Sequence, residues 1–356
     1  MDNSSDSTIV FNDNRFCNYC SQALINKDIV YFPNENGREK MDALISQLKK
    51  EGQGKQYDCM MGISGGLDSS YLAYLGYKMG LRILAIHIDD GFDTALATDN
   101  INKLCSACNI ELITIKPDAE QYNDITRAFF LAEVPNVAIP QDNILFAYLY
   151  KYAKKYKVKT FLSGGNFALE SVLKSTEKVN AFDMVHIRDI NKKYGQKPMD
   201  KLVFMTNYQK ITDRYLHKIK SVRPLNYINY NKQQAISELS KFCDFNYYEY
   251  KHCENRLTKV IQLHWLIKKF NDDKRTSHLS SLIVSGQMTR EEALVQLNCL
   301  PYDEKTLEDD IKFVLSKLGL SRKEYDKLID SKGKKHADYK LSIAYKIANT
   351  YLKKLI

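Results

Sequence analysis

The chain lacks the features that mark membrane and secreted proteins. No apolar run approaches the roughly 20 residues that a membrane-spanning helix needs, so we expect no membrane insertion. The polar start, residues 1–7, does not read as a signal peptide. The 8 cysteines are mostly scattered, which indicates a reducing compartment rather than a disulfide framework. These absences together predict a cytoplasmic protein.

Two common nucleotide-binding loops are absent as well. A Walker loop ends in Gly-Lys-Ser/Thr, but no lysine lies between Lys55 and Lys78. A dinucleotide-binding loop needs a third glycine, and Ser69 or Ser70 takes that place. The net charge of +9 suits anionic partners such as nucleotides. The basic residues are nevertheless spread along the chain without a recognisable RNA-binding module, so we expect no nucleic-acid partner.

The 356 residues fall into three blocks, enough for two domains with proper cores. Residues 1–40 form a small N-terminal segment that contains cysteines, and residues 231–356 carry mainly helical patterns. Residues 41–230 alternate short apolar strands with helices, which predicts an α/β fold with a doubly wound parallel sheet. Ligands of such sheets bind beyond the carboxyl ends of the strands. The predicted strands are Tyr57–Ile63, Arg82–Ile88, Glu111–Ile115 and Thr160–Ser163, and the predicted C-terminal helices are Asn231–Phe242, Thr289–Leu297, Ser321–Ile329 and Ala337–Ile356.

The most specific motif lies between the first predicted strand and the helix that follows it. Gly62–Ser70 reads Gly-Ile-Ser-Gly-Gly-Leu-Asp-Ser-Ser. Glycines let the backbone approach an anion, and the amides and dipole of a helix start attract it. Asp68 is placed to orient the loop or to hold Mg²⁺, although an ordinary βα turn is the alternative. The residues expected to bind phosphate are Ser64, Gly65, Gly66, Asp68, Ser69 and Ser70.

Polar residues follow two other predicted strands. At the end of the second strand, the backbone near Ile88 could bind adenine, and Asp89, Asp90 and Asp93 could contact ribose or a metal, or form a solvated turn. His87, inside that strand, is more typical of a packed core histidine. After the fourth strand comes a second glycine pair that enters a helix, with Gly164, Gly165, Asn166 and Glu170 as candidate ligands. A plain turn is the alternative there.

Further candidates lie in segments that mix acid, base and histidine. Asp142 and Asn143 precede a helix and either cap it or belong to a site. Residues 251–256 and 272–278 suit an anionic substrate, because arginine can fork onto phosphate or carboxylate, or they are solvated faces. The candidates for catalysis are Lys251 and Arg256, and those for substrate binding are Asp142, His252, Glu254, Lys274, Arg275 and His278.

Cys17 and Cys20 form half of a tetrahedral zinc site. Cys105 and Cys108 are the other close pair, at one-turn spacing on a predicted helix, where they can equally be buried apolar residues. Three alternatives stay open: a zinc site that joins the two pairs, zinc on Cys17 and Cys20 with other ligands, and no metal at all.

Several of these segments together resemble known families. The loop at 64–70 resembles the PP-loop of ATP pyrophosphatases, which cut ATP between its α and β phosphates. In order and spacing, almost the whole chain is similar to the N-acetyl sugar amidotransferases of bacterial surface-polysaccharide synthesis. The segments that carry this likeness are residues 16–20, 64–70, 139–142, 162–171, 224–230, 251–256 and 274–293. Family members typically have a further Cys-x-x-Cys before the pair at Cys17, which this chain lacks, so either the chain is shortened or the zinc site is incomplete or absent.

The resemblance implies an enzyme that uses ATP to convert an acetamido group of a nucleotide-sugar into an acetamidino group, in lipopolysaccharide or capsule synthesis. It further implies ATP and Mg²⁺ as cofactors, with Mg²⁺ held by Asp68 and Glu170. No cysteine stands in a Gly-x-Cys-x-Gly turn and residue 2 is aspartate, so we expect a separate glutaminase subunit to supply ammonia. The alternatives are a tRNA-thiolating PP-loop enzyme and an inactive ATP-binding scaffold for a glutaminase.

Overall fold

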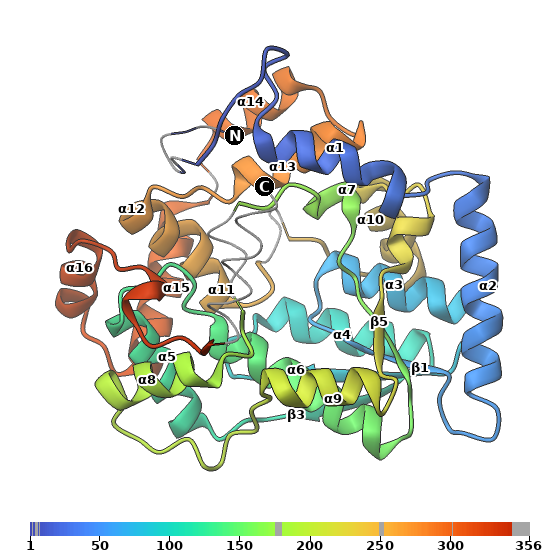
Figure 1. The fold of residues 1–356 in the computed structure, drawn as a ribbon, viewed down its shortest axis with the longest axis horizontal. Coiled ribbons are helices and arrows are strands. Elements are labelled where there is room, and N and C mark those ends of the chain that lie inside the picture. Colours follow the sequence, from blue (N-terminus) through green and yellow to red (C-terminus); the bar gives the residue numbers. More distant parts are fainter. Residues whose placement is uncertain are drawn as a thin grey trace.

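A five-stranded parallel sheet forms the centre of the molecule (Figure 1). The computed structural model describes residues 1, 3, 6, 8–174, 180–248, 253–300 and 302–343. The strand order is β3-β2-β1-β4-β5, and every neighbouring pair is parallel. The α/β sheet predicted from the sequence is confirmed. The strands are β1 (Cys59–Gly62), β2 (Ile83–Ile88), β3 (Glu111–Ile115), β4 (Thr160–Leu162) and β5 (Lys220–Val222).

Helices cover both faces of the sheet, as a doubly wound fold requires. Successive strand residues point to opposite faces. Met60 packs with residues of α6 (Ile139–Lys155) in one core cluster. Its neighbours Cys59 and Met61 pack in another cluster with residues of α2 (Glu35–Glu51), α3 (Leu67–Lys78) and α4 (Ala95–Ala107).

The C-terminal region is mainly helical, as predicted, and shares its cores with the α/β part. Residues of α10 (Lys232–Cys243) and α13 (Arg275–Ser285) belong to the cluster that contains Met61. A third cluster surrounds the buried Trp265 and joins α5 (Ala119–Leu131) and α8 (Met184–Tyr194) to the C-terminal helices. The remaining elements are α1 (Asn18–Val30), α7 (Phe167–Glu170), α9 (Asn207–Tyr215), η2 (Pro224–Tyr227), α11 (Arg256–Val260), the π-helical η3 (Ile261–Trp265), α12 (Leu266–Phe270), α14 (Arg290–Asn298), α15 (Glu304–Leu318), α16 (Arg322–Asp330) and η4 (His336–Asp338).

Local capping explains where the predicted C-terminal helices begin. Thr289 and Glu292 form a capping box at the start of α14, and Ser321 and Glu324 form one at α16. The last predicted helix, 337–356, lies mostly outside the described residues. Within the part of the chain that the structure describes, no helix combines the length and apolar character needed to cross a bilayer.

Candidate functional site

The strand order places a topological switch point between β1 and β4. Ligands of doubly wound sheets bind at such a point, beyond the carboxyl ends of the strands. The loops after the two strands touch there, because a Cβ atom added to Gly164 would lie only 3.0 Å from the Ser69 nitrogen. The predicted phosphate loop and the second glycine turn therefore form one continuous edge.

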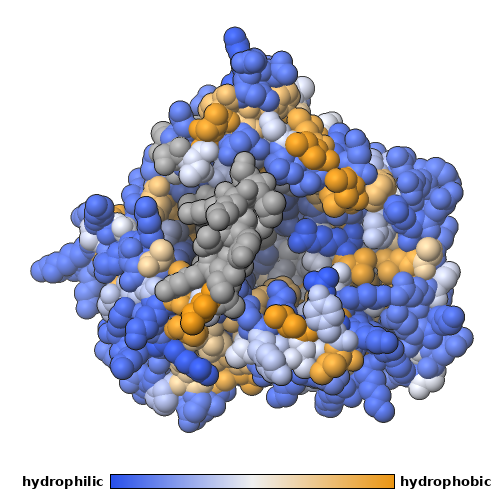
Figure 2. All heavy atoms as spheres, in the orientation of Figure 1, coloured by the Kyte–Doolittle hydropathy of each residue, from blue (hydrophilic) through white to orange (hydrophobic). Residues whose placement is uncertain are grey.

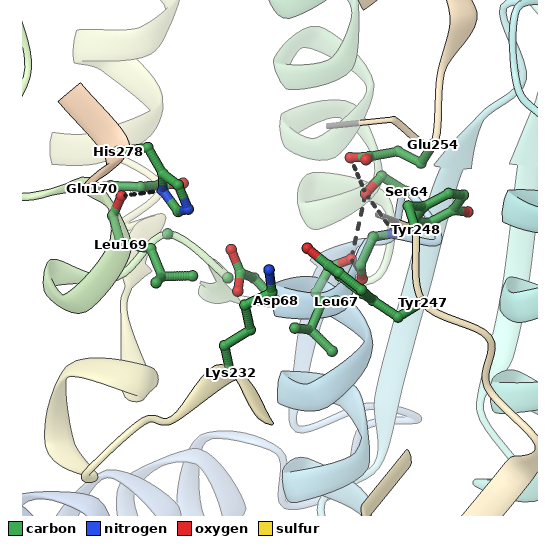
Figure 3. A pocket seen from close by; sticks show the side chains of 14 residues that line it. Ser64, Leu67, Asp68, Leu169, Glu170, Lys232, Tyr247, Tyr248, Glu254 and His278 are labelled. Atoms are coloured by element: carbon green, nitrogen blue, oxygen red, sulfur yellow. Dashed lines mark hydrogen bonds between the residues drawn. The ribbon is translucent and has the colours of Figure 1, made fainter. Parts of the chain in front are cut away.

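A cavity of about 210 Å³ opens at this edge (Figure 3). One side comes from the loop after β1 and the start of α3, and the other from the turn after β4. Residues of the C-terminal region complete it. The lining residues are Ser64, Gly66, Leu67, Asp68, Ser69, Gly164, Gly165, Leu169, Glu170, Lys232, Tyr247, Tyr248, Glu254 and His278.

The loop after β1 is shaped by its own hydrogen bonds and by α4. Gly65 has a φ of +78°, and a Cβ atom there would lie 2.6 Å from the Ala97 carbonyl oxygen. Ser64 Oγ accepts from the Gly66 amide at 3.3 Å, and Ser69 Oγ donates to the Gly66 carbonyl at 3.2 Å. No side chain caps the first amides of α3, which leaves a helix start suited to an anion. Ser70, in contrast, is fully buried and does not line the cavity.

Asp68 is held in place by a tyrosine from far along the chain. Tyr230 Oη donates a hydrogen bond of 2.5 Å to Asp68 Oδ1. Burial and the nearby carboxylate raise the pKa of Tyr230, so the phenol stays a donor at neutral pH. The Asp68 carboxylate is thereby oriented at the cavity wall (Figure 3).

The turn after β4 contributes one carboxylate and a structural asparagine. Asn166 is buried, accepts from the Leu169 amide at 3.0 Å and donates to the Gly164 carbonyl at 3.1 Å. It shapes the turn and caps α7 rather than lining the cavity. Glu170 and His278 do line it, and the Nδ1 of His278 lies 3.1 Å from the Leu169 carbonyl oxygen.

Glu254 reaches the phosphate loop because its segment crosses the end of β2. The Thr94 amide donates to the Glu254 carbonyl at 2.9 Å, and the Arg256 amide donates to the Phe92 carbonyl at 2.8 Å. The Glu254 carboxylate then accepts a hydrogen bond of 3.4 Å from Ser64 Oγ. Glu254 was predicted as a substrate ligand, and its side chain lies in the cavity beside the loop.

The residues that follow β2 support the loop from behind. His87 is buried, with Nδ1 at 2.9 Å from the Ile63 carbonyl oxygen and Nε2 at 3.1 Å from Asp93 Oδ2. Burial disfavours the charged ring, but the Asp93 carboxylate overcomes it and raises the pKa of His87. Asn255 Nδ2 joins this network by donating to Asp93 and to buried Asp90. His87 is therefore a packed histidine, as expected, that also ties the loop to the segment of Glu254.

Several other candidates lie outside the cavity. Asp89 pairs with Lys116 at 3.0 Å, and neither Ile88 nor Asp89 is among the lining residues. Arg256 lies 3.5 Å from Asp310, and Arg275 binds Asp273 at 2.7 Å. The other outlying candidates are Asp142, exposed in the first turn of α6, and Lys274, beside a smaller cavity of about 50 Å³. Lys251 and His252 lie outside the described residues.

Five lining residues were not among the predicted ligands: the apolar Leu67 and Leu169, and the polar Lys232, Tyr247 and Tyr248. Lys232 opens α10, and its Nζ lies 4.7 Å from the centre of the Tyr247 ring. Lys232 thereby brings a cation to the cavity that the phosphate loop lines. The only sequence signal for Lys232 as a site residue is that it lies two positions after Tyr230, the end of the segment 224–230 that carries part of the family likeness.

Two carboxylates in the cavity suit Mg²⁺. This ion is usually bound by one or two carboxylates together with substrate phosphates and waters, and Asp68 and Glu170 supply such oxygens. Among the residues that the structure describes, no group of three or more potential ligands comes together.

The N-terminal cysteine pair offers only two thiols. Cys17 Sγ and Cys20 Sγ lie 3.2 Å apart, and hydrogen bonding between the two side chains lowers the pKa of Cys17 to about 6. Cys105 and Cys108 are buried in the core with raised pKa values of about 11 and about 12, because burial disfavours their thiolates. Cys105 and Cys108 are therefore apolar residues of the core.

The C-terminal part of the chain matches a known family. Residues 254–352 match the model of the LPS biosynthesis protein WbpG-like, C-terminal domain. These residues are similar to that domain, and we refer to them as the WbpG-like region. The WbpG-like region supplies Glu254 and His278 to the cavity, so it takes part in the site together with the phosphate loop.

Other comparisons give more distant likenesses. A segment of 146 residues is 31% identical to the tRNA-specific 2-thiouridylase MnmA of Photorhabdus laumondii and covers 39% of this chain. The match spans only 36% of that relative's length. An NMN synthetase structure from Francisella tularensis is 17% identical, with a TM-score of 0.37, and the match covers 80% of this chain and 97% of that one. An NH3-dependent NAD synthetase from Campylobacter jejuni is 14% identical, with a TM-score of 0.30 and coverages of 58% and 93%.

The fold agrees with the PP-loop type that the sequence predicts. The parallel sheet has a Ser-Gly-Gly-x-Asp loop at its switch point, followed by a helix that no side chain caps. The helical C-terminal region closes over that loop through Glu254 and His278. A loop suited to an anion and a WbpG-like region thus line the same cavity.

Proposed function

We propose that this protein is an ATP-dependent amidotransferase that converts an acetamido group of a nucleotide-sugar into an acetamidino group. One observation carries the proposal. The phosphate loop and the WbpG-like region line the same cavity, and the two are joined by the hydrogen bond from Ser64 to Glu254. This arrangement supports a reaction in which the loop would bind ATP and the WbpG-like region would bind the sugar in the same cavity.

The chemistry needs activation because an amide oxygen is a poor leaving group. In the first step the acetamido oxygen attacks the α phosphorus of ATP, and pyrophosphate departs. The uncapped amides of α3, with the hydroxyls of Ser64 and Ser69, would hold the pyrophosphate. Lys232 would offset its negative charge. Mg²⁺, held by Asp68 and Glu170, would supply further neutralisation of the phosphates.

In the second step ammonia attacks the activated imidate carbon, and AMP leaves with the former amide oxygen. The added nitrogen must lose one of its three protons as AMP leaves, which gives the acetamidino product as its amidinium cation. Glu254 and His278 are the cavity residues on the WbpG-like side that can accept it. The rings of Tyr247 and Tyr248 wall the same cavity and would limit the entry of water, which competes with ammonia for the imidate.

The ammonia is proposed to come from a separate glutaminase subunit. None of the cysteines stands in the Gly-x-Cys-x-Gly turn that a glutaminase nucleophile occupies. Among the described residues, no cysteine lines the cavity. Free ammonium at high concentration would then replace the partner.

A second candidate, tRNA thiolation, draws on the 31% identity to MnmA. Thiolation needs a reactive sulfur near the activated base. Cys59 is the cysteine nearest in sequence to the phosphate loop, and it is buried within β1, where burial raises its pKa. The cavity therefore favours the sugar substrate.

The two candidates can be separated by one incubation. The purified protein is supplied with ATP, Mg²⁺ and ammonium, together with either total tRNA or a pool of nucleotide-sugars that carry acetamido groups, and pyrophosphate release is measured. We expect release with the sugars and background release with tRNA. A response to tRNA alone would refute the proposal.

A further inference from the structure

A basic and apolar surface lies on helix α9 and the end of α6, away from the cavity. Four large apolar or aromatic side chains of α9 and the residue after it face outward: Tyr208, Ile211, Tyr215 and Leu216. Positions 208, 211 and 215 follow helical spacing and share one face. In Figure 2, hydrophobic side chains lie at the surface where Figure 1 places α9, among hydrophilic ones.

Cations surround this apolar stripe. Lys210, Arg214 and Lys218 are exposed on the same segment, and Lys154 of α6 reaches it by pairing with Asp213 at 3.0 Å. The only carboxylate between residues 206 and 223 is Asp213, which is buried. Residues 144–162 contain no acidic side chain, and they add the exposed lysines Lys151, Lys155, Lys157 and Lys159.

We propose that this surface docks the protein on an anionic lipid membrane. A helix with an outward apolar face and flanking lysine or arginine is typical of segments that lie in the membrane interface without crossing it. Tyrosine favours the headgroup level because its ring is apolar and its hydroxyl is polar. Anionic headgroups match the exposed cations of this surface. Ile211 and Leu216 enter the acyl boundary, where burial of their side chains contributes more binding free energy than contact with a nucleic acid would.

The topology leaves the catalytic cavity accessible in this orientation. Helix α9 leads into the amino end of β5, whose first residue, Lys220, pairs with Thr160 at the start of β4. The cavity lies at the opposite, carboxyl edge of the sheet. A protein that rests on α9 can therefore exchange substrates with the aqueous phase while it is attached to the membrane.

The test is sedimentation of the full chain with lipid vesicles, measured without ATP or sugar so that it is independent of the proposed function. We expect binding to vesicles of phosphatidylcholine with phosphatidylglycerol, and little binding to phosphatidylcholine alone. Salt at 0.5 M should weaken it, because exposed charges are screened. The double variant Ile211→Ser/Leu216→Ser should bind the anionic vesicles at least about tenfold more weakly than the wild type. The affinity of Arg214→Gln/Lys218→Gln should fall by a similar factor.

Helix α1 offers a matched control. Ile25 and Ile29 are 64% and 67% exposed, similar to Ile211 at 57% and Leu216 at 74%, but α1 carries one lysine and one aspartate instead of a basic surface. Ile25→Ser/Ile29→Ser should bind vesicles like the wild type. The proposal would be overturned if Ile25→Ser/Ile29→Ser lost as much vesicle binding as Ile211→Ser/Leu216→Ser, or if the wild type did not bind anionic vesicles. A nucleic-acid surface would be favoured instead if a short RNA abolished vesicle binding and Ile211→Ser/Leu216→Ser left that binding unchanged. This result would also overturn the proposal.

Discussion

Ser64 donates a hydrogen bond of 3.4 Å to the carboxylate of Glu254, a residue 190 positions further along the chain. This bond joins the phosphate loop after β1 to the WbpG-like region. Two backbone hydrogen bonds hold the contact: the Thr94 amide donates to the Glu254 carbonyl, and the Arg256 amide donates to the Phe92 carbonyl. The C-terminal region therefore forms part of the cavity lining.

The first prediction concerns the Glu254 carboxylate. Glu254→Gln should lower the rate of acetamidino formation by about a hundredfold, because the amide cannot accept the proton that ammonia must lose. AMP formation should fall less, because activation of the acetamido oxygen precedes that step. Product formation and AMP release are measured by chromatography. Glu308→Gln, which alters an exposed ion pair with Arg322, should leave both rates unchanged, and an unchanged product rate in Glu254→Gln would remove Glu254 from the mechanism.

A second prediction tests why Gly65 is glycine. Gly65 and Gly54 both have positive φ, +78° and +71°, but a Cβ atom would meet the Ala97 carbonyl only at Gly65 and nothing within 4 Å at Gly54. Gly54→Ala should cost about 1 kcal/mol of unfolding free energy from backbone conformation alone. Gly65→Ala should cost clearly more and also displace the loop, with loss of pyrophosphate release. Equal costs in urea denaturation would show that α4 does not constrain the loop.

A third prediction follows from the raised pKa of His87. Its folded pKa lies above the unfolded value near 6.5, so the stabilisation is fully present below pH 6.5 and is lost as pH rises through the folded pKa. The wild type should therefore lose unfolding free energy between pH 6 and pH 9 relative to His87→Gln. Asp90 is retained in both proteins, so its raised pKa cancels in the comparison. Parallel curves for the wild type and His87→Gln would contradict the assignment.

The source of ammonia gives a fourth prediction. With ATP and the acetamido sugar, high ammonium chloride should support product formation by this chain alone, whereas glutamine should not. Addition of the proposed glutaminase subunit should make glutamine effective. Product formation from glutamine by the purified single chain would show that it carries its own glutaminase activity.

Much of the fold follows from the sequence because the signals are local. The four predicted strands and the predicted helices that correspond to α14 and α16 depend on neighbouring residues, and the structure confirms these elements. Phosphate binding by the loop at 64–70 stays a prediction. Strand β5 was missed, because three partly exposed residues, Lys-Ser-Val, carry no apolar pattern.

The site was harder to predict because folding brings distant residues together. Glu254 and His278 were chosen as candidates, but nothing local places them beside Ser64 and Asp68. Tyr230 and Lys232 reach the loop only through the packing of α10. Arg256 and Arg275 looked like ligands, yet nearby carboxylates engage both guanidinium groups. The binding roles of all these residues stay predictions.

The most direct test of the account is sugar-dependent AMP formation by the wild type and by Asp68→Ala. Asp68 lines the cavity, is oriented by Tyr230 and is the loop's only carboxylate, so its loss should reduce AMP and pyrophosphate release to background, with the circular dichroism spectrum unchanged. Asp68→Ala that formed AMP from ATP and the sugar at the wild-type rate would contradict the claim that this loop is where ATP is cleaved.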